Sequence, residues 1–129
     1  MVGIDKYLHN PLLKNAVSDA RAVGAELDSK GATVVNAINC TISELKSKID
    51  EYLGLLREDD VAMLYFAGHG CEYGNALRMF AISEGDESNI DTDTVMVEAL
   101  INKFVAIIQL FVQGRFDNDR LGVFLTFYF

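Results

Sequence analysis

An uninterrupted apolar run at residues 61–66 (VAMLYF) constrains the fold of this chain more than any other feature. A run this short, without polar alternation, is typical of a strand that is covered on both faces of a parallel sheet. The next residues read AGHG, so His69, between Gly68 and Gly70, would lie where that strand leaves the sheet. Ligand sites of open parallel sheets collect at this edge. The sequence therefore predicts a parallel sheet with His69 at its functional edge.

Helix-like and strand-like patterns alternate ahead of this run. Apolar residues recur at helical spacing over about 13–29, between two short β-prone segments at 1–4 and 33–38. Thr41 and Glu44 have the spacing of a capping box, which indicates the start of a second helix. Successive βα units form right-handed crossovers and a parallel sheet that helices cover. We therefore predict a three-layer α/β fold, in which helices flank a mostly parallel sheet that is incomplete at both ends.

The second half of the chain has weaker patterns. Gly74 and Asn75 predict a hairpin turn, and a third helix is expected from near Asp93. The apolar run at 105–112 is either a continuation of that helix or a fourth parallel strand, and we favour a strand for part of it. The closing segment, 123–129, is apolar and β-prone, which makes it an aggregation hazard unless a partner covers it.

Charge and cysteine content exclude several classes of protein. With 129 residues and a net charge of -8, the chain is expected to form one domain over 1–129 that does not bind nucleic acid. Cys40 and Cys71 allow at most one disulfide, and no basic-then-apolar leader precedes Met1. The apolar run at 104–112 is far shorter than the roughly 20 residues that span a membrane. We therefore expect a cytoplasmic protein with reduced thiols and no membrane partner.

Several short motifs follow one another in a characteristic order. They are GIDKY at 3–7, NAVSDA at 15–20, Gly31, and YFAGHG at 65–70. Together they resemble the large-subunit region of caspase-like cysteine peptidases, with metacaspases and paracaspases as the best match. The resemblance covers roughly residues 2–80, and the tail from about residue 104 is atypical. Gly-His-Gly alone is weak evidence, but its place at the end of the third predicted strand is specific.

The resemblance implies roles for individual residues. In that family the histidine after the third strand works with a cysteine after the fourth, so His69 would take the proton of a thiol that is mostly protonated at neutral pH. Gly70 would supply a backbone N–H to the oxyanion. Asp19 would lie in the first specificity pocket and pair with an Arg or Lys of the substrate. Ala67 stands where many metacaspases have a serine, which departs from the family pattern.

The cysteine that this mechanism requires is missing, because none follows Cys71. In caspases the histidine precedes the catalytic cysteine by about 50 residues, which points to position 119 here. The chain reads FDNDR at 116–120, so Asp119 would replace the cysteine and Asp117 would match a second pocket carboxylate. Alternatively, the tail after Phe104 has no counterpart in the family.

Other residues are candidates for a substitute nucleophile or for metal ligands. Cys71 lies two residues after His69, so both side chains would leave the strand on the same side, and Cys71 is a possible substitute nucleophile. Residues so close on one strand provide the oxyanion donors and the opening opposite the histidine poorly. Cys40 is most simply a small buried residue. His69, Cys71 and Glu72 match no established zinc spacing, so no metal site is expected.

Two functions therefore remain open. The first is a cysteine endopeptidase domain that cuts peptide or protein substrates after a basic residue, represented here by its histidine half: His69, Gly70 and Asp19. The second is a catalytically inactive, truncated or pseudo-peptidase that binds peptides or associates with itself or with a related peptidase. No cofactor is expected: the acidic loop at 84–93 lacks EF-hand spacing, so calcium rests on family analogy alone.

Overall fold

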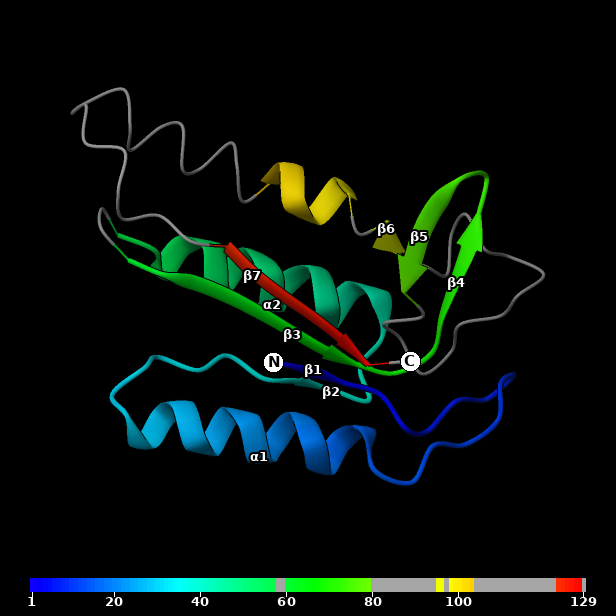
Figure 1. Cartoon of the computed structure of the whole chain (residues 1–129), viewed down its shortest axis with the longest axis horizontal. Coiled ribbons are helices and arrows are strands. Elements are labelled where there is room, and N and C mark those ends of the chain that lie inside the picture. Colours follow the sequence, from blue (N-terminus) through cyan, green and yellow to red (C-terminus); the bar gives the residue numbers. More distant parts are fainter. Residues whose placement is uncertain (58–59, 80–94, 97, 104–122, 129) are drawn as a thin grey trace.

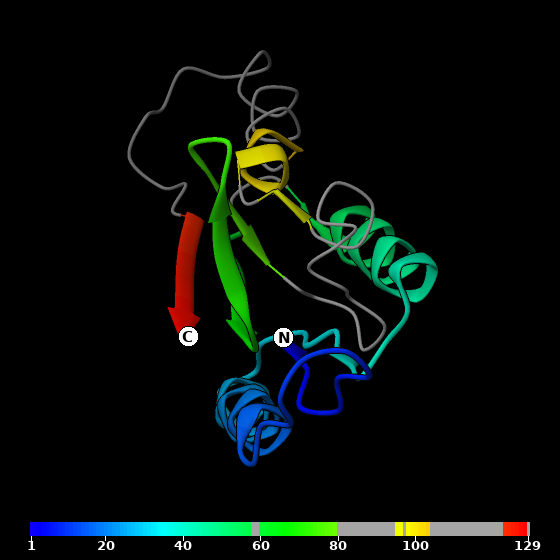
Figure 2. The same cartoon turned by 90° about the vertical axis from the view of Figure 1, so that its right-hand side faces the viewer.

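The computed structural model describes residues 1–57, 60–79, 95–96, 98–103 and 123–128. Among these residues, the main sheet has the strand order β2-β1-β3-β7, and all neighbouring strands are parallel. The strands are β1 (Val2–Gly3), β2 (Ala37–Ile38), β3 (Ala62–Ala67) and β7 (Val123–Tyr128). Helices α1 (Ala16–Ser29) and α2 (Ile42–Leu55) lie on the two sides of the strands (Figures 1 and 2). The predicted three-layer α/β fold is confirmed.

Strand β3 runs through the centre of the core, which explains its continuous apolar sequence. Successive side chains of a strand point to opposite faces. Ala62, Leu64 and Phe66 belong to the buried cluster that includes Leu45 of α2. Tyr65 and Ala67 belong to the buried cluster that includes Ala16 and Ala20 of α1. Both faces of β3 are therefore covered, as the apolar run predicts.

Helix α1 begins at Ala16, a little later than the helical spacing from about residue 13 predicts. The N–H of Leu13 donates to the carbonyl of Asp5 at 3.0 Å instead of joining the helix. The loop after β1 is thereby folded back on itself before α1 starts. The same loop contacts His69 of the candidate site.

Helix α2 begins with the predicted capping box. The N–H of Thr41 donates to Glu44 Oε2 at 2.8 Å, and the N–H of Glu44 donates to Thr41 Oγ1 at 3.3 Å. The backbone N–H and the hydroxyl of Thr41 hold the pKa of the Glu44 carboxyl below its usual value. Two of the free donors at the helix start are satisfied in this way.

Thr41→Ala is expected to lower the free energy of unfolding by about 1 kcal/mol at pH 7, because the helix loses its capping hydroxyl. Because the pKa of Glu44 is lower in the folded than in the unfolded state, the stability that it adds is complete above its unfolded pKa. That stability is lost as the pH falls through the folded pKa, so the difference between the variant and the parent should narrow in acid, and the part that comes from the bond between the Glu44 N–H and Thr41 Oγ1 should remain. Urea unfolding at pH 7 and in acid measures this. Thr41→Ser keeps the hydroxyl, and an equal loss in that control would contradict the explanation.

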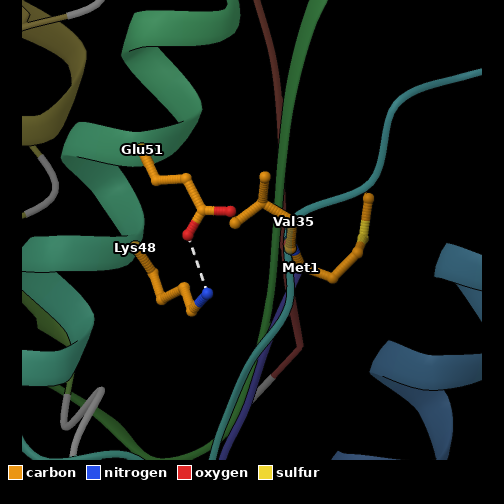
Figure 3. A network of polar contacts seen from close by, with 4 residues as sticks. All are labelled: Met1, Val35, Lys48 and Glu51. Atoms are coloured by element: carbon orange, nitrogen blue, oxygen red, sulfur yellow. Dashed lines mark hydrogen bonds and ion pairs between the residues drawn. The ribbon is translucent and has the colours of Figure 1, made fainter.

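Strand β2 is shorter than the segment predicted over 33–38. Pairing with β1 covers only Ala37 and Ile38, because β1 itself has only two residues. Ahead of β2, the Met1 ammonium donates to the carbonyl of Val35 at 2.8 Å (Figure 3). Burial lowers the pKa of this ammonium to about 6. The predicted strand is therefore confirmed only at Ala37–Ile38, because strand length depends on the partner strand.

A small antiparallel sheet follows β3, with the order β4-β5-β6 (Figure 1). Its strands are β4 (Gly70–Tyr73), β5 (Ala76–Met79) and β6 (Val95–Met96). Gly74 and Asn75 have φ values of 58° and 60°, so they form the predicted tight turn between β4 and β5. Residues 98–103 are helical, but the helix expected from near Asp93 does not include residues 95–96, because these pair with β5.

The closing segment is a strand that pairs with β3 along its whole length, from Ala62 opposite Val123 to Ala67 opposite Tyr128. A partner therefore covers one edge of this β-prone segment. The strand predicted within 105–112 lies outside the described residues. In the described ranges, no helix has the length and apolar character that crossing a membrane requires.

Candidate active site

His69 lies directly after β3 at the carboxyl edge of the main sheet, where the chain turns into β4 (Figure 1). Its backbone N–H donates to the hydroxyl of Tyr7 at 2.9 Å, and its Nε2 lies 2.8 Å from the carbonyl oxygen of Pro11. The rings of Tyr7 and His69 are tilted by 52° with their centroids 4.7 Å apart. All three contacts are made by Tyr7 and Pro11 of the loop that follows β1.

The Pro11 contact fixes which ring nitrogen of His69 carries the proton. A carbonyl oxygen only accepts hydrogen bonds, so in the neutral imidazole Nε2 must donate and Nδ1 must hold the lone pair. This assignment follows from the hydrogen-bond partner. It leaves Nδ1 as the basic nitrogen of His69. The sequence did not single out Pro11, because any residue has a carbonyl and no pattern marks one that will meet a side chain.

Asn39 holds the start of the loop that carries Tyr7 and Pro11. Its side-chain Oδ1 accepts the N–H groups of Asp5 and Lys6 at 3.0 and 3.1 Å, and its Nδ2 donates to Asp5 Oδ1 at 3.0 Å. Its own backbone has a φ of 45°, a left-handed conformation that asparagine tolerates better than most residues. Sequence reasoning missed Asn39. An asparagine directly after a β-prone segment was the available signal.

The lack of space around Gly68 explains why a glycine precedes His69. A Cβ at this position would lie 2.6 Å from the Tyr7 hydroxyl oxygen and 2.7 Å from the Phe66 ring. Only glycine lets the backbone approach Tyr7 closely enough for the His69 N–H to reach the hydroxyl. Burial raises the pKa of Tyr7 above its ordinary value, so the hydroxyl stays protonated around neutral pH.

The other predicted site residues lie in different settings. Asp19 is exposed in the first turn of α1, and Gly70 opens β4. Cys71 on β4 is partly buried and packs against the α2-side cluster. Cys40 is buried within that cluster, and burial raises the pKa of its thiol. Asp117 and Asp119, together with the acidic loop at 84–93, lie outside the described residues.

A cavity of about 280 Å³ lies away from His69, between α2 and the amino ends of the strands. Met1, Val35 and Ile49 are among its lining residues. Lys48 also lines it, and its Nζ pairs with Glu51 Oε2 at 2.7 Å on the same helix (Figure 3). Within the ranges that the structure describes, no cluster of three His, Cys, Asp or Glu side chains could hold a metal ion.

A parallel sheet with helices on both faces and an oriented histidine at the end of a central strand is the architecture of a caspase-type domain. The family model described as "Caspase domain" matches residues 1–118, so this chain belongs to the caspase domain family.

Two curated relatives are similar to part of the chain. It is 32% identical over 77 residues to mucosa-associated lymphoid tissue lymphoma translocation protein 1 of Homo sapiens. The homolog of that protein in Mus musculus is 32% identical over 77 residues as well. Each match covers 59% of this chain and 9% of the relative, so the chain spans less than a tenth of the relatives' length.

Proposed function

We propose that this chain is the histidine-bearing part of a cysteine endopeptidase domain that cleaves peptides or proteins after a basic residue. The observation that carries the proposal is the 2.8 Å contact between His69 Nε2 and the Pro11 carbonyl. Because this contact occupies Nε2 as a donor, Nδ1 remains to take the proton of an attacking thiol. Membership of the caspase domain family supports a peptide or protein as the substrate.

Gly70 would donate its N–H to the oxyanion of the tetrahedral intermediate. The turn between β4 and β5 has two residues, so its flanking pair, Tyr73 and Ala76, is hydrogen-bonded. Pairs in an antiparallel ladder alternate between hydrogen-bonded and non-hydrogen-bonded. By this alternation, Gly70 opposite Met79 is a non-hydrogen-bonded pair, and the Gly70 N–H points away from β5. A donor beside His69 that β5 does not use supports this role.

Asp19 would select a basic residue in the substrate. Its exposed carboxylate is in the first turn of α1, whose buried residues Ala16 and Ala20 pack in one cluster with Ala67 at the end of β3. A carboxylate there pairs with the guanidinium of Arg or the ammonium of Lys. Asp117 is proposed as a second pocket carboxylate on the family resemblance alone.

The nucleophile would come from one of two places. Cys71 follows His69 closely in sequence and is the substitute within this chain. Otherwise the thiol would come from a related peptidase that associates with this chain. Either thiol must come within about 3 Å of Nδ1, directly or through one water molecule.

The second candidate function is an inactive caspase-type module that binds peptides or pairs with a related peptidase. The surroundings of both cysteines favour it: Cys40 is buried with a raised pKa, and Cys71 packs against the apolar cluster. The buried Cys40 thiol, with its raised pKa, stays protonated around neutral pH and is a weak nucleophile. Cys40 and Cys71 form no disulfide with each other, and a cytoplasmic location is proposed for either function.

A thiol-reactive peptidyl probe with Arg next to the reactive group separates the two functions. If the chain is a peptidase, mass spectrometry should find one adduct on Cys71 that disappears in His69→Ala and in Cys71→Ser. Cys40→Ser is the matched control and should keep the adduct. A folded chain without a His69-dependent adduct would overturn the proposal for these residues and leave the binding module.

The same probe tests Asp19. With the Arg probe, the parent should be labelled faster than Asp19→Asn. With a probe that has an uncharged residue of similar length in place of Arg, the parent and Asp19→Asn should be labelled at the same rate. Equal labelling of the parent by both probes would exclude Asp19 as the specificity residue.

A further inference from the structure

Tyr7 contacts His69 in two different ways, one through its hydroxyl and one through its ring. Its hydroxyl accepts the His69 backbone N–H, and its ring lies against the imidazole ring. Tyr7 is 4% exposed and His69 is half-buried, so solvent reaches these contacts only from the side of His69. We propose that Tyr7 is a positioning residue, which sets the direction of the His69 imidazole through its hydroxyl. The inference rests on the proposed role of His69 as the base.

The Tyr7 hydroxyl accepts a backbone hydrogen bond that a neighbouring strand would accept if the sheet continued. Strands β1 and β3 are parallel, and the N–H of Ile4 donates to the carbonyl of Ala67 at 3.0 Å. Alternate residues of β3 face β1, so the N–H of His69 is the next donor on this edge of the ladder. The chain leaves the sheet after Ile4, and the hydroxyl of Tyr7 accepts that N–H instead. The Tyr7 hydroxyl thereby holds the backbone of His69 beside the loop after β1, although the ladder has ended.

The position of Tyr7 is itself fixed from two sides. Asn39 binds the N–H groups of Asp5 and Lys6, which immediately precede Tyr7. Gly68 leaves the space that the hydroxyl occupies, since a Cβ there would be 2.6 Å from it. The same loop presents the Pro11 carbonyl to Nε2. The loop after β1 therefore contacts the backbone N–H, one face of the ring and the Nε2 atom of His69. The Nδ1 atom remains to accept a proton.

Tyr7→Phe is the direct test, because it keeps the ring and removes only the hydrogen-bond acceptor. In the parent, the ¹⁵N spectrum of the neutral His69 imidazole should show one dominant tautomer with the proton on Nε2. In Tyr7→Phe, we expect a mixture of both tautomers, because the ring is no longer held against Pro11. If the parent reacts with the Arg probe, the maximal labelling rate should fall about tenfold or more while the probe concentration for half-maximal rate changes little.

Tyr52→Phe is a matched control from the same chain. The Tyr52 hydroxyl also accepts a backbone N–H, that of Met63, at 3.0 Å, but it lies on α2 away from His69. Its removal should reduce stability without changing the His69 tautomer or the labelling rate. If Tyr7→Phe behaves in the same way, Tyr7 is only structural and the proposal is wrong.

The tautomer measurement needs no catalysis, so it distinguishes a failure of this inference from a failure of the proposed function. A parent that is not labelled but shows the tautomer change in Tyr7→Phe would overturn the peptidase and retain the positioning role. Should Tyr7→Phe fail to fold, amide exchange in the parent gives a second test. The His69 N–H should exchange slowly although it lies beyond the end of β3, and rapid exchange would contradict the proposal.

Discussion

Phe66→Ala is expected to lower the free energy of unfolding by about 3–5 kcal/mol, the range for removing a fully buried aromatic side chain. Phe66 is 0% exposed and lies in the cluster between β3 and α2. Truncation loses the transfer free energy of the ring and leaves a cavity that Leu45 and Ile4, both fully buried, cannot fill without moving. A domain of this size has only about 5–15 kcal/mol in total, so the variant should be near the limit of folding. Urea unfolding followed by circular dichroism measures the change.

Val61→Ala is the matched control for Phe66→Ala. Val61 directly precedes β3 but is 61% exposed, so its truncation should change the free energy of unfolding by less than about 0.5 kcal/mol. Equal effects of the two substitutions would mean that β3 is not buried in the way described here.

Gly3→Ala is expected to destabilise the chain by about 1–3 kcal/mol, because it inserts a methyl group into a closed contact. The new Cβ would lie 2.7 Å from the Cβ of Ala20 and 2.9 Å from the carbonyl oxygen of Ala16. Both atoms belong to α1, so the helix would have to move away from β1. The shift of the thermal or urea midpoint reports the cost.

Gly54→Ala is the same chemical change in open space and should have the opposite sign. Among the described residues, no atom other than the chain neighbours and the backbone of α2 itself lies within 4 Å of the added Cβ, and Gly54 is the second-last residue of α2. Alanine is favoured over glycine in a helix by about 1 kcal/mol, so this variant should be more stable than the parent. If both substitutions destabilise the chain, the close contact between β1 and α1 does not explain the effect of Gly3→Ala.

The features that the sequence predicts well are those that depend on neighbouring residues. The apolar run before His69, the capping box at Thr41 and Glu44, and the turn at Gly74 and Asn75 each contain their own physical cause. The length of β2 and the existence of β6 depend on strands elsewhere in the chain, so local pattern could not settle them.

The same distinction applies to the candidate site. His69 was evident from its glycines and its place after a buried strand. The groups that orient it were not, because the carbonyl of Pro11 and the hydroxyl of Tyr7 gain their roles only when the loop folds back. That fold depends on Asn39, whose contacts with Asp5 and Lys6 span more than thirty residues of sequence.

Strand β3 has β1 on one side and β7 on the other, and these neighbours come from opposite ends of the chain. A ribosome makes the chain from its N-terminus, so β3 can pair with β1, which itself pairs with β2, well before residues 123–128 emerge. Until then, the strand that leads to His69 has an open edge, which is a template for pairing with other chains. Closing that edge is a long-range step, and such steps slow folding. A segment that is synthesised well after β3 therefore protects the strand that leads to the histidine.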